Sequence, residues 1–424
     1  MFGLSSFYKR LVFLFLVVAL GFNYTVFNFS PPIYTVHILL AGMIVITFGL
    51  ILLVEYGKLI LNIAQFAYIL AFLILMGVRF EQARFLEEFA KITLIFIVFY
   101  IFLVIYKNFR VSIRTTTIAF VLGTFISVFT MTNFTGMGLA SLQSRLEVNN
   151  LGNFNAYGVL ISIGFIQALY LFRTSSRPIA KILLFICMIL FIDILLSTLS
   201  RGGTVTLLIG VLFFSLLAWK DSNAKLTKRN QLLTMAPYFI LVSLFFIGAL
   251  FLYEPLGQSV SSAYKNWESL FARLPDITST GGSGRLGLWE FLLRDLWDSG
   301  LTGIVFGKGI GSIQLYYLES IFNSSHNLYI SVLYQLGIIG LFVLLTIILM
   351  TFRHLWHLPT SNEKALLLAI FAQLVVGSVF DSYYGSSQVG WMFGFWFALF
   401  WAVNKRRFDF ANKHSLIHVF GERC

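Results

Sequence analysis

Three basic residues lie beside glycines or at predicted helix starts, where their side chains suit phosphate binding and proton transfer. Arg201 lies in SRGGT, Arg285 in GSGRLGLW and His326 in HNLYISVLYQLGIIG. A guanidinium can place two hydrogen bonds on a phosphate, and the N–H groups of a helix start favour the same anion. A histidine can accept a proton from a hydroxyl near neutral pH. Gly202 and Gly203 allow a tight turn or a close approach to a neighbour. These residue types indicate an anion site with a general base beside it.

Each of the three side chains also has a purely structural interpretation. Arg201 can be an arginine that reaches from a helix end to the membrane interface. Arg285 can be a loop residue paired with Glu290 or Asp295. His326 can cap the helix that follows it. The sequence leaves both interpretations open for each residue.

Three more charged residues are candidates for the same site. Arg145 lies in a predicted outer segment, where a pair with Glu147 is the alternative. Asp193 falls inside a predicted span, and acids within a membrane are a functional hypothesis by default. Asp381, near the outer end of another span, could orient the histidine or anchor Arg201. A structural ion pair is the alternative for both aspartates.

The elements that must position these residues are predicted to be membrane helices. Of the 424 residues 58% are hydrophobic and 11% are charged, whereas about a quarter of an average soluble domain is charged. Apolar runs of roughly 18 residues or more indicate membrane spans, and lipid favours helices because it leaves backbone groups without partners. We therefore predict an all-α polytopic protein, a single transmembrane domain over 1–424. Twelve spans are expected at about 11–29, 33–54, 59–78, 92–106, 116–134, 154–172, 179–199, 203–219, 236–253, 327–350, 364–383 and 389–403.

The positive charge of the chain predicts its orientation. The formal net charge is +12, and 20 of the 30 Lys and Arg residues fall in alternate loops and the two terminal tails. The positive-inside rule places those segments in the cytoplasm, so both termini are expected there. No nucleic-acid partner is needed to explain the charge. The apolar run after Lys9 and Arg10 lacks a clear cleavage site, so we interpret it as a retained span.

A segment of about 70 residues, 254–326, is predicted to be a large loop on the outer, periplasmic side. One stretch, SSAYKNWESLFARL (261–274), has an apolar face at helical spacing that suits the headgroup layer. A second helix is expected to be capped by Ser283 and to run to Asp298. The loop is thus predicted to contain short amphipathic helices.

No metal or cofactor is expected. The pairs His354–His357 and His414–His418 have ligand-like spacing, but they lie on the predicted cytoplasmic side without a matching cluster of Cys, Asp or Glu. The glycines of FGKGIGS (306–312) match neither phosphate-loop pattern. We interpret them as turn formers.

Taken together, these motifs resemble the O-antigen ligase and polymerase superfamily of bacterial membrane glycosyltransferases. SRGGT, GSGRLGLW, GKGIGS and HNLYISVLYQLGIIG occur in the order typical of that family, and NLGNFNAYGVL (150–160) resembles its asparagine-containing segment. The resemblance covers roughly residues 140–345.

The resemblance implies a metal-independent, inverting transfer of a glycan from undecaprenyl diphosphate at the periplasmic face of the bacterial inner membrane. A ligase uses the lipid A-core oligosaccharide as acceptor, and this is the function that we predict. By motif, Arg201 and Arg285 would hold the diphosphate and His326 would assist the acceptor hydroxyl. The predicted substrate ligands are Arg201, Arg285, Arg145, Asn327 and Asp381.

Three other functions remain open. A polymerase of the same superfamily would pass the glycan to another carrier-linked repeat. A transporter or flippase for lipid-linked polysaccharide also fits twelve spans and Asp193, although paired broken helices are not evident in the sequence. A structural membrane partner would function without Arg285.

Overall fold

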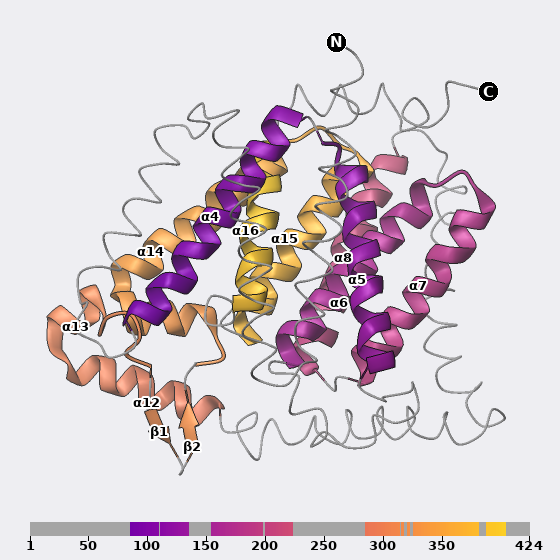
Figure 1. Cartoon of the computed structure of the whole chain (residues 1–424). Coiled ribbons are helices and arrows are strands. Elements are labelled where there is room, and N and C mark those ends of the chain that lie inside the picture. The colour runs from indigo at the N-terminus through magenta and orange to yellow at the C-terminus, as the bar shows by residue number, and fades with distance from the viewer. Residues whose placement is uncertain are drawn as a thin grey trace.

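The computed structural model describes residues 85–109, 111–134, 154–197, 200–223, 285–313, 315–317, 320–322, 325–380 and 387–403. Within these ranges the chain is almost entirely helical (Figure 1). The helices are α4 (Phe85–Phe109), α5 (Ile113–Phe134), α6 (Phe154–Thr174), α7 (Pro178–Ser197), α8 (Arg201–Asn223), α12 (Arg285–Asp298), α13 (Gly300–Phe306), α14 (Leu328–Trp356), α15 (Asn362–Phe380) and α16 (Ser387–Ala402).

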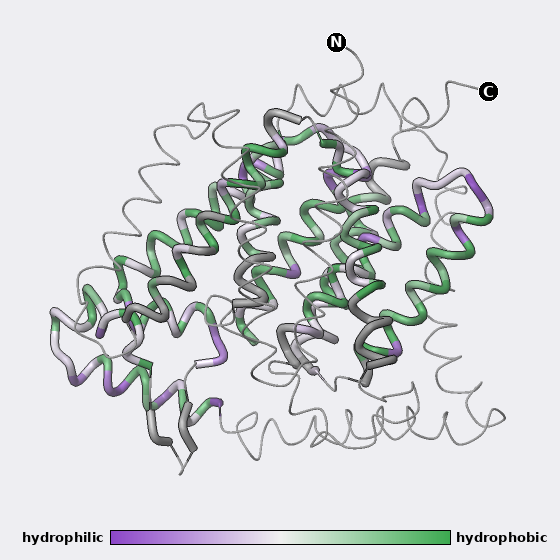
Figure 2. The backbone as a smooth tube through the Cα atoms, in the orientation of Figure 1, coloured by the Kyte–Doolittle hydropathy of each residue, from purple (hydrophilic) through white to green (hydrophobic). Residues whose placement is uncertain are grey.

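Four of these helices are long and apolar enough to cross a membrane, namely α6, α7, α14 and α15. Shorter apolar stretches occur in α5, α8 and α16. Figure 2 shows that hydrophobic residues cover most of α7 and α14. The chain is therefore a helical membrane protein, as the composition predicted. The predicted spans at 11–29, 33–54, 59–78 and 236–253 lie outside the described residues, so the number twelve stays a prediction.

Two parts of the described chain differ from the predicted helices. The helix α4 begins at Phe85, earlier than the predicted span 92–106. Its first turns contain the charged residues Glu87, Glu88 and Lys91, which lie outside the apolar run from which the span was predicted. A small antiparallel hairpin lies in the predicted loop, with β1 (Leu315–Tyr317) paired to β2 (Ser320–Phe322). Three aromatic or β-branched residues in this hairpin, Tyr316, Tyr317 and Ile321, favour strands.

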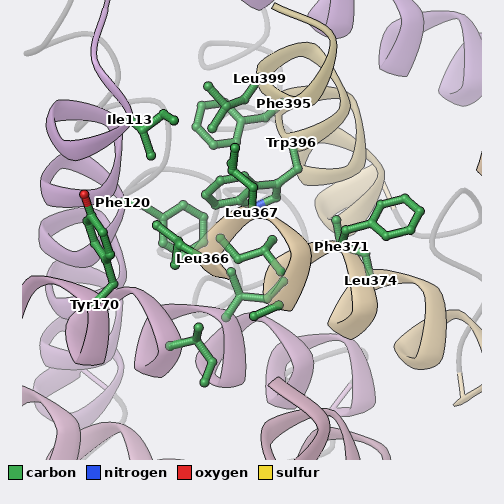
Figure 3. Packing of buried hydrophobic residues seen from close by; sticks show 14 of the residues in the cluster. Ile113, Phe120, Tyr170, Leu366, Leu367, Phe371, Leu374, Phe395, Trp396 and Leu399 are labelled. Atoms are coloured by element: carbon green, nitrogen blue, oxygen red, sulfur yellow. The ribbon is translucent and has the colours of Figure 1, made fainter. Parts of the chain in front are cut away.

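The core lies between α4, α5, α6, α15 and α16, where large side chains are fully buried (Figure 3). The ring centroids of Phe120 and Trp396 are 5.3 Å apart, and Phe102 and Phe395 meet edge to face at 4.8 Å. Leu366 is completely buried between these helices. Aromatic pairs at such distances add about 0.5–1.5 kcal/mol each beyond the burial of their area.

A buried polar contact ties α6, α8 and α15 together. The amide Nε2 of Gln373 donates to Ser162 Oγ at 3.3 Å and to the carbonyl oxygen of Thr206 at 3.2 Å. The Gln373 side chain packs against Gly210, where a Cβ would collide with it. Small residues and hydrogen bonds of this kind hold membrane helices in close contact.

The helix contacts define two ends of the bundle. At one end the Tyr170 hydroxyl contacts Glu363 Oε1 at 3.0 Å, and Arg173 donates to the carbonyl oxygen of Ala218 at 3.0 Å. The last turns of α6 and α8 and the first turn of α15 therefore lie together. The first turns of α6, α8 and α14 and the last turn of α15 lie at the opposite end. This arrangement places predicted inner loops and candidate site residues at opposite ends of the bundle.

Candidate active site

Arg201 is the first residue of α8, and only residues 198–200 separate this helix from α7. Ser200 caps the helix, because its Oγ accepts a hydrogen bond from the N–H of Gly203 at 3.0 Å. A Cβ on Gly202 would lie 2.7 Å from Cβ of Phe380, and one on Gly203 would lie 2.8 Å from the backbone of Gly158. The prediction that these glycines permit a close approach is confirmed.

Arg285 is the first residue of α12 and is half-buried. Its Nη1 donates a hydrogen bond to the carbonyl oxygen of Phe380, the last residue of α15, at 3.1 Å. Phe380 is also the neighbour of Gly202. One residue at the end of α15 therefore connects the SRGGT segment with the GSGRLGLW segment, which are about 80 positions apart.

Trp289, one helical turn after Arg285, connects α12 to the histidine segment. Its indole Nε1 donates to the carbonyl oxygen of Ser325 at 2.8 Å. His326 follows with φ of 51°, the one non-glycine residue with positive φ among the described residues. Backbone in this left-handed region is uncommon outside glycine and occurs where surrounding contacts impose it. The contacts of Ser325 and Asn327 hold the chain on both sides of the histidine.

Asn327 is the N-cap of α14, the helix in which Tyr329 and Ile330 lie. Its Oδ1 accepts hydrogen bonds from their N–H groups at 2.9 and 3.1 Å. The Tyr329 hydroxyl donates to the carbonyl oxygen of Val375 in α15 at 2.8 Å. The structure thus gives Asn327 a capping role, and its predicted contact with substrate stays a prediction.

Three motifs therefore meet at the last turns of α15. Gly202 packs on Phe380, Arg285 binds the carbonyl of Phe380, and Tyr329 binds the carbonyl of Val375. The helices α8, α12 and α14 all begin at this end (Figure 1). Each helix N-terminus carries about half a positive charge, so this end of the bundle favours an anion.

A second group of polar residues, which the sequence did not indicate, fixes α12 to α14. Asp295 contacts Lys308 Nζ at 2.6 Å and accepts a hydrogen bond from the Tyr334 hydroxyl at 2.5 Å. Partial burial would raise the pKa of Asp295, but the hydrogen bonds from Lys308 and Tyr334 and the lysine charge lower that pKa overall. Glu290, the other acid proposed as a partner for Arg285, contacts Arg294.

The glycines of FGKGIGS are turn formers, as predicted, because Gly307, Gly309 and Gly311 all have positive φ. Their segment packs against a break in α14 that the sequence did not predict. Gly337 has φ of 67° and interrupts the helix. The carbonyls of Tyr334 and Gln335, just before the break, accept hydrogen bonds from the N–H groups of Lys308 and Gly309 at 2.8 and 3.0 Å. The loop thus supplies the donors that the broken helix lacks.

The remaining predicted residues lie outside the described ranges or stay untested as members of this group. Arg145, Asp381 and Ser283 lie outside the described residues. Asp193 is half-buried within α7. The rings of His354 and His357 contact the carbonyls of Val403 and Arg353, and the described residues include no group of three potential metal ligands.

Residues 183–345 match the family model described as O-antigen ligase. This match confirms the resemblance predicted from the motifs. It includes SRGGT, GSGRLGLW, GKGIGS and HNLYISVLYQLGIIG, whereas NLGNFNAYGVL precedes it. No curated protein matches the chain.

Proposed function

We propose that this member of the O-antigen ligase superfamily is a ligase that transfers a glycan from undecaprenyl diphosphate to a hydroxyl of the lipid A-core oligosaccharide. The transfer would take place at the periplasmic face of the bacterial inner membrane. The family match and the apolar helices support a membrane enzyme of the ligase or polymerase type. The choice of ligase, donor and acceptor is our proposal.

The observation that carries the proposal is the meeting of Gly202, Arg285 and the His326 segment around the last turns of α15. In the proposed reaction, the acceptor oxygen forms a bond to the anomeric carbon of the glycan. The bond from that carbon to the diphosphate oxygen breaks, and the electron pair leaves with the diphosphate. His326 takes the proton of the acceptor hydroxyl. Attack opposite the leaving group inverts the anomeric centre.

The guanidiniums of Arg201 and Arg285 would neutralise the charge that develops on the leaving diphosphate. Loss of one such contact typically costs about 3–4 kcal/mol, or a factor of 10²–10³ in rate. A diphosphate held in this way is a good leaving group, so the reaction would need no nucleotide. The positive ends of three helices add to the field of the two guanidiniums. The chemistry therefore rests on groups that the chain itself supplies.

A polymerase shares the donor chemistry and differs in its acceptor. Deletion of a ligase leaves long glycan on the carrier, whereas deletion of a polymerase leaves single repeats attached to the core. The glycan profile of a deletion strain, with and without the gene restored, therefore separates the two functions.

A transporter is the alternative from another class, and the break in α14 bears on it. Broken helices in transporters leave backbone groups directed at a substrate or ion near the membrane midplane. At Gly337 the two carbonyls before the break are bound by Lys308 and Gly309 of the same chain. The break thus serves the contact between α13 and α14, which favours an enzyme. Purified protein that moves lipid-linked glycan across liposomes without forming a glycosidic product would instead indicate a transporter.

Transfer by purified protein tests the proposal directly. Lipid-linked glycan and core acceptor are incubated with the protein in the presence of EDTA and without nucleotide, and the product is resolved by electrophoresis. Arg201→Ala, Arg285→Ala and His326→Ala are each expected to abolish transfer while the protein still accumulates in the membrane. Arg294→Ala is the matched control, because Arg294 lies on α12 and is largely exposed. Near-normal transfer by any two of the three variants would overturn the site assignment.

A further inference from the structure

The helix α12 has three distinct faces. Leu288, Leu292 and Leu296 are four residues apart and are buried against α14 and Ile313. Leu286, Leu293 and Trp297 are seven and four residues apart, so they form a second stripe. All three are exposed, and Trp297 is 73% exposed. The buried face of α12 already packs against the protein core, so the core does not account for this second apolar stripe.

The third face of α12 is mainly polar, and Phe291 is the apolar residue exposed on it. Arg294 and Asp298 are exposed there, and Glu290, which contacts Arg294, lies at its border with the apolar stripe. A helix that is buried against protein on one side, polar on another and apolar but exposed on a third has the pattern of a helix in a membrane interface. Figure 2 shows hydrophilic and hydrophobic residues mixed along α12, in contrast to α14.

Exposed apolar residues also occur on the neighbouring elements α13 and α14. In α13, Leu301 is 78% exposed and Phe306 is exposed as well. This helix packs on α14 at the Gly337 break. From the break onward α14 exposes Ile338, Phe342, Leu345 and Leu349, which lie on one side of the helix. Because α14 is long and apolar enough to span the membrane, this side would face lipid in a bilayer.

We propose that the exposed apolar residues of α12 and α13 lie in the bilayer, at the boundary between headgroups and acyl chains, as a continuation of the lipid-facing side of α14. In this arrangement, lipid covers the exposed apolar residues of α12 and α13. In Figure 1, α12 runs crosswise beneath the N-terminal part of α14. Tryptophan is enriched at this depth because its ring is apolar and its N–H is polar, and Trp297 matches that preference.

This placement has a consequence that rests on the proposed function. Arg285 begins the helix that lies in the interface, so its guanidinium is held near the depth of the lipid phosphates. The diphosphate of a membrane-bound carrier lies at the same depth. The interfacial helix would thus bring the anion site to its substrate without a large movement of either.

Site-directed spin labelling tests the placement without reference to activity. The two native cysteines are replaced by alanine, and single cysteines are introduced at Trp297 and Leu293 on the apolar stripe. Asp298 on the polar face is the matched control, and Phe342 on α14 is the reference for lipid exposure, because 69% of its surface is exposed. Each full-length protein is labelled with a nitroxide, placed in lipid nanodiscs and measured with oxygen and with a water-soluble nickel chelate.

We expect the labels at 297 and 293 to collide more with oxygen than with the nickel chelate, as the label at 342 does. The label at 298 should show the opposite preference. If the labels at 297 and 293 prefer the nickel chelate, the stripe faces water and the proposal is wrong. If those two labels are protected from both agents, another protein segment covers the stripe, and the proposal is equally wrong. Failure of the unaltered protein to transfer glycan, together with the expected pattern of collisions, would contradict the proposed function alone.

Discussion

The guanidinium of Arg285 donates a hydrogen bond to the carbonyl oxygen of Phe380 at 3.1 Å, and the ring of Phe380 packs on Gly202. This contact joins the start of α12 to the end of α15 and the first turn of α8. Phe380 carries no chemistry of its own. Its position nevertheless determines how two segments of the predicted anion site lie relative to each other.

Arg285→Lys should reduce transfer strongly, although it keeps the positive charge. The lysine ammonium is a point charge and lacks the planar fork that binds the Phe380 carbonyl and that would, in the proposed site, also bind a phosphate oxygen. We expect a loss of about 10²-fold in kcat/KM, near the loss caused by removing one charge-stabilising donor. The measurement is in vitro transfer at several donor concentrations. Activity within a few-fold of the unaltered protein would show that the fork is not required.

Gly202→Ala should destabilise the bundle and impair transfer. The added methyl group would lie 2.7 Å from Cβ of Phe380, so α8 and α15 must move apart. Overpacking of this kind typically costs about 1–3 kcal/mol. Thermal unfolding in detergent and transfer activity are measured together. Val205→Ala, at an exposed position on α8, is the control and should behave normally. Normal stability of Gly202→Ala would contradict the tight contact.

Trp289→Phe should lower activity more than stability. The variant keeps an aromatic ring but loses the donor to the Ser325 carbonyl, which precedes the strained backbone of His326. One hydrogen bond is worth about 1 kcal/mol, so a drop in kcat of roughly 5-fold is expected. If Trp289 acts only by positioning the histidine segment through this hydrogen bond, the change should appear in kcat and in its pH profile and leave KM unaltered. Trp297→Phe, on the exposed side of the same helix, is the control.

The sequence predicted the described membrane helices and the positions of the motifs at helix boundaries well, because both depend on local patterns. Apolar runs set the length of α6, α7 and α15, and the SRGGT and GSGRLGLW motifs mark the starts of α8 and α12. The turn role of Gly307 was predictable for the same reason, since positive φ favours glycine.

The sequence did not predict the contacts that bring these motifs together. Phe380 and Trp289 look like ordinary apolar residues in the sequence, and their roles come from partners 95 and 36 positions away. The break at Gly337 was missed because a single glycine is tolerated inside an apolar helix, and the donors that stabilise the break come from the loop after α13. Such long-range contacts depend on how the helices pack, which a residue pattern does not encode.

Asp295→Asn should remove a stabilising contact that depends on pH. The pKa of Asp295 is lowered in the folded protein, so its ionised form stabilises the fold above the usual pKa of 3.8, and this stabilisation is lost as the pH falls through the lower folded value. The variant should therefore be less stable than the unaltered protein at pH 7, and the difference should shrink below pH 3.8. Thermal unfolding measured across this range checks the sign. A difference that stays constant with pH would exclude the ionic contact with Lys308.

Gly337→Ala should be among the most damaging single changes in α14. At φ of 67° an L-residue is strained by about 1–2 kcal/mol, and its Cβ would collide with the carbonyl of Val305 and the N–H of Gly307. The break would then have to straighten or α13 would have to move, and either change displaces the loop that connects α12 to α14. We expect a lower midpoint of thermal unfolding together with reduced transfer. Ile338→Ala, at the next position but exposed, is the control and should leave both nearly unchanged. If Gly337→Ala unfolds at the same temperature as Ile338→Ala, α14 does not need its break.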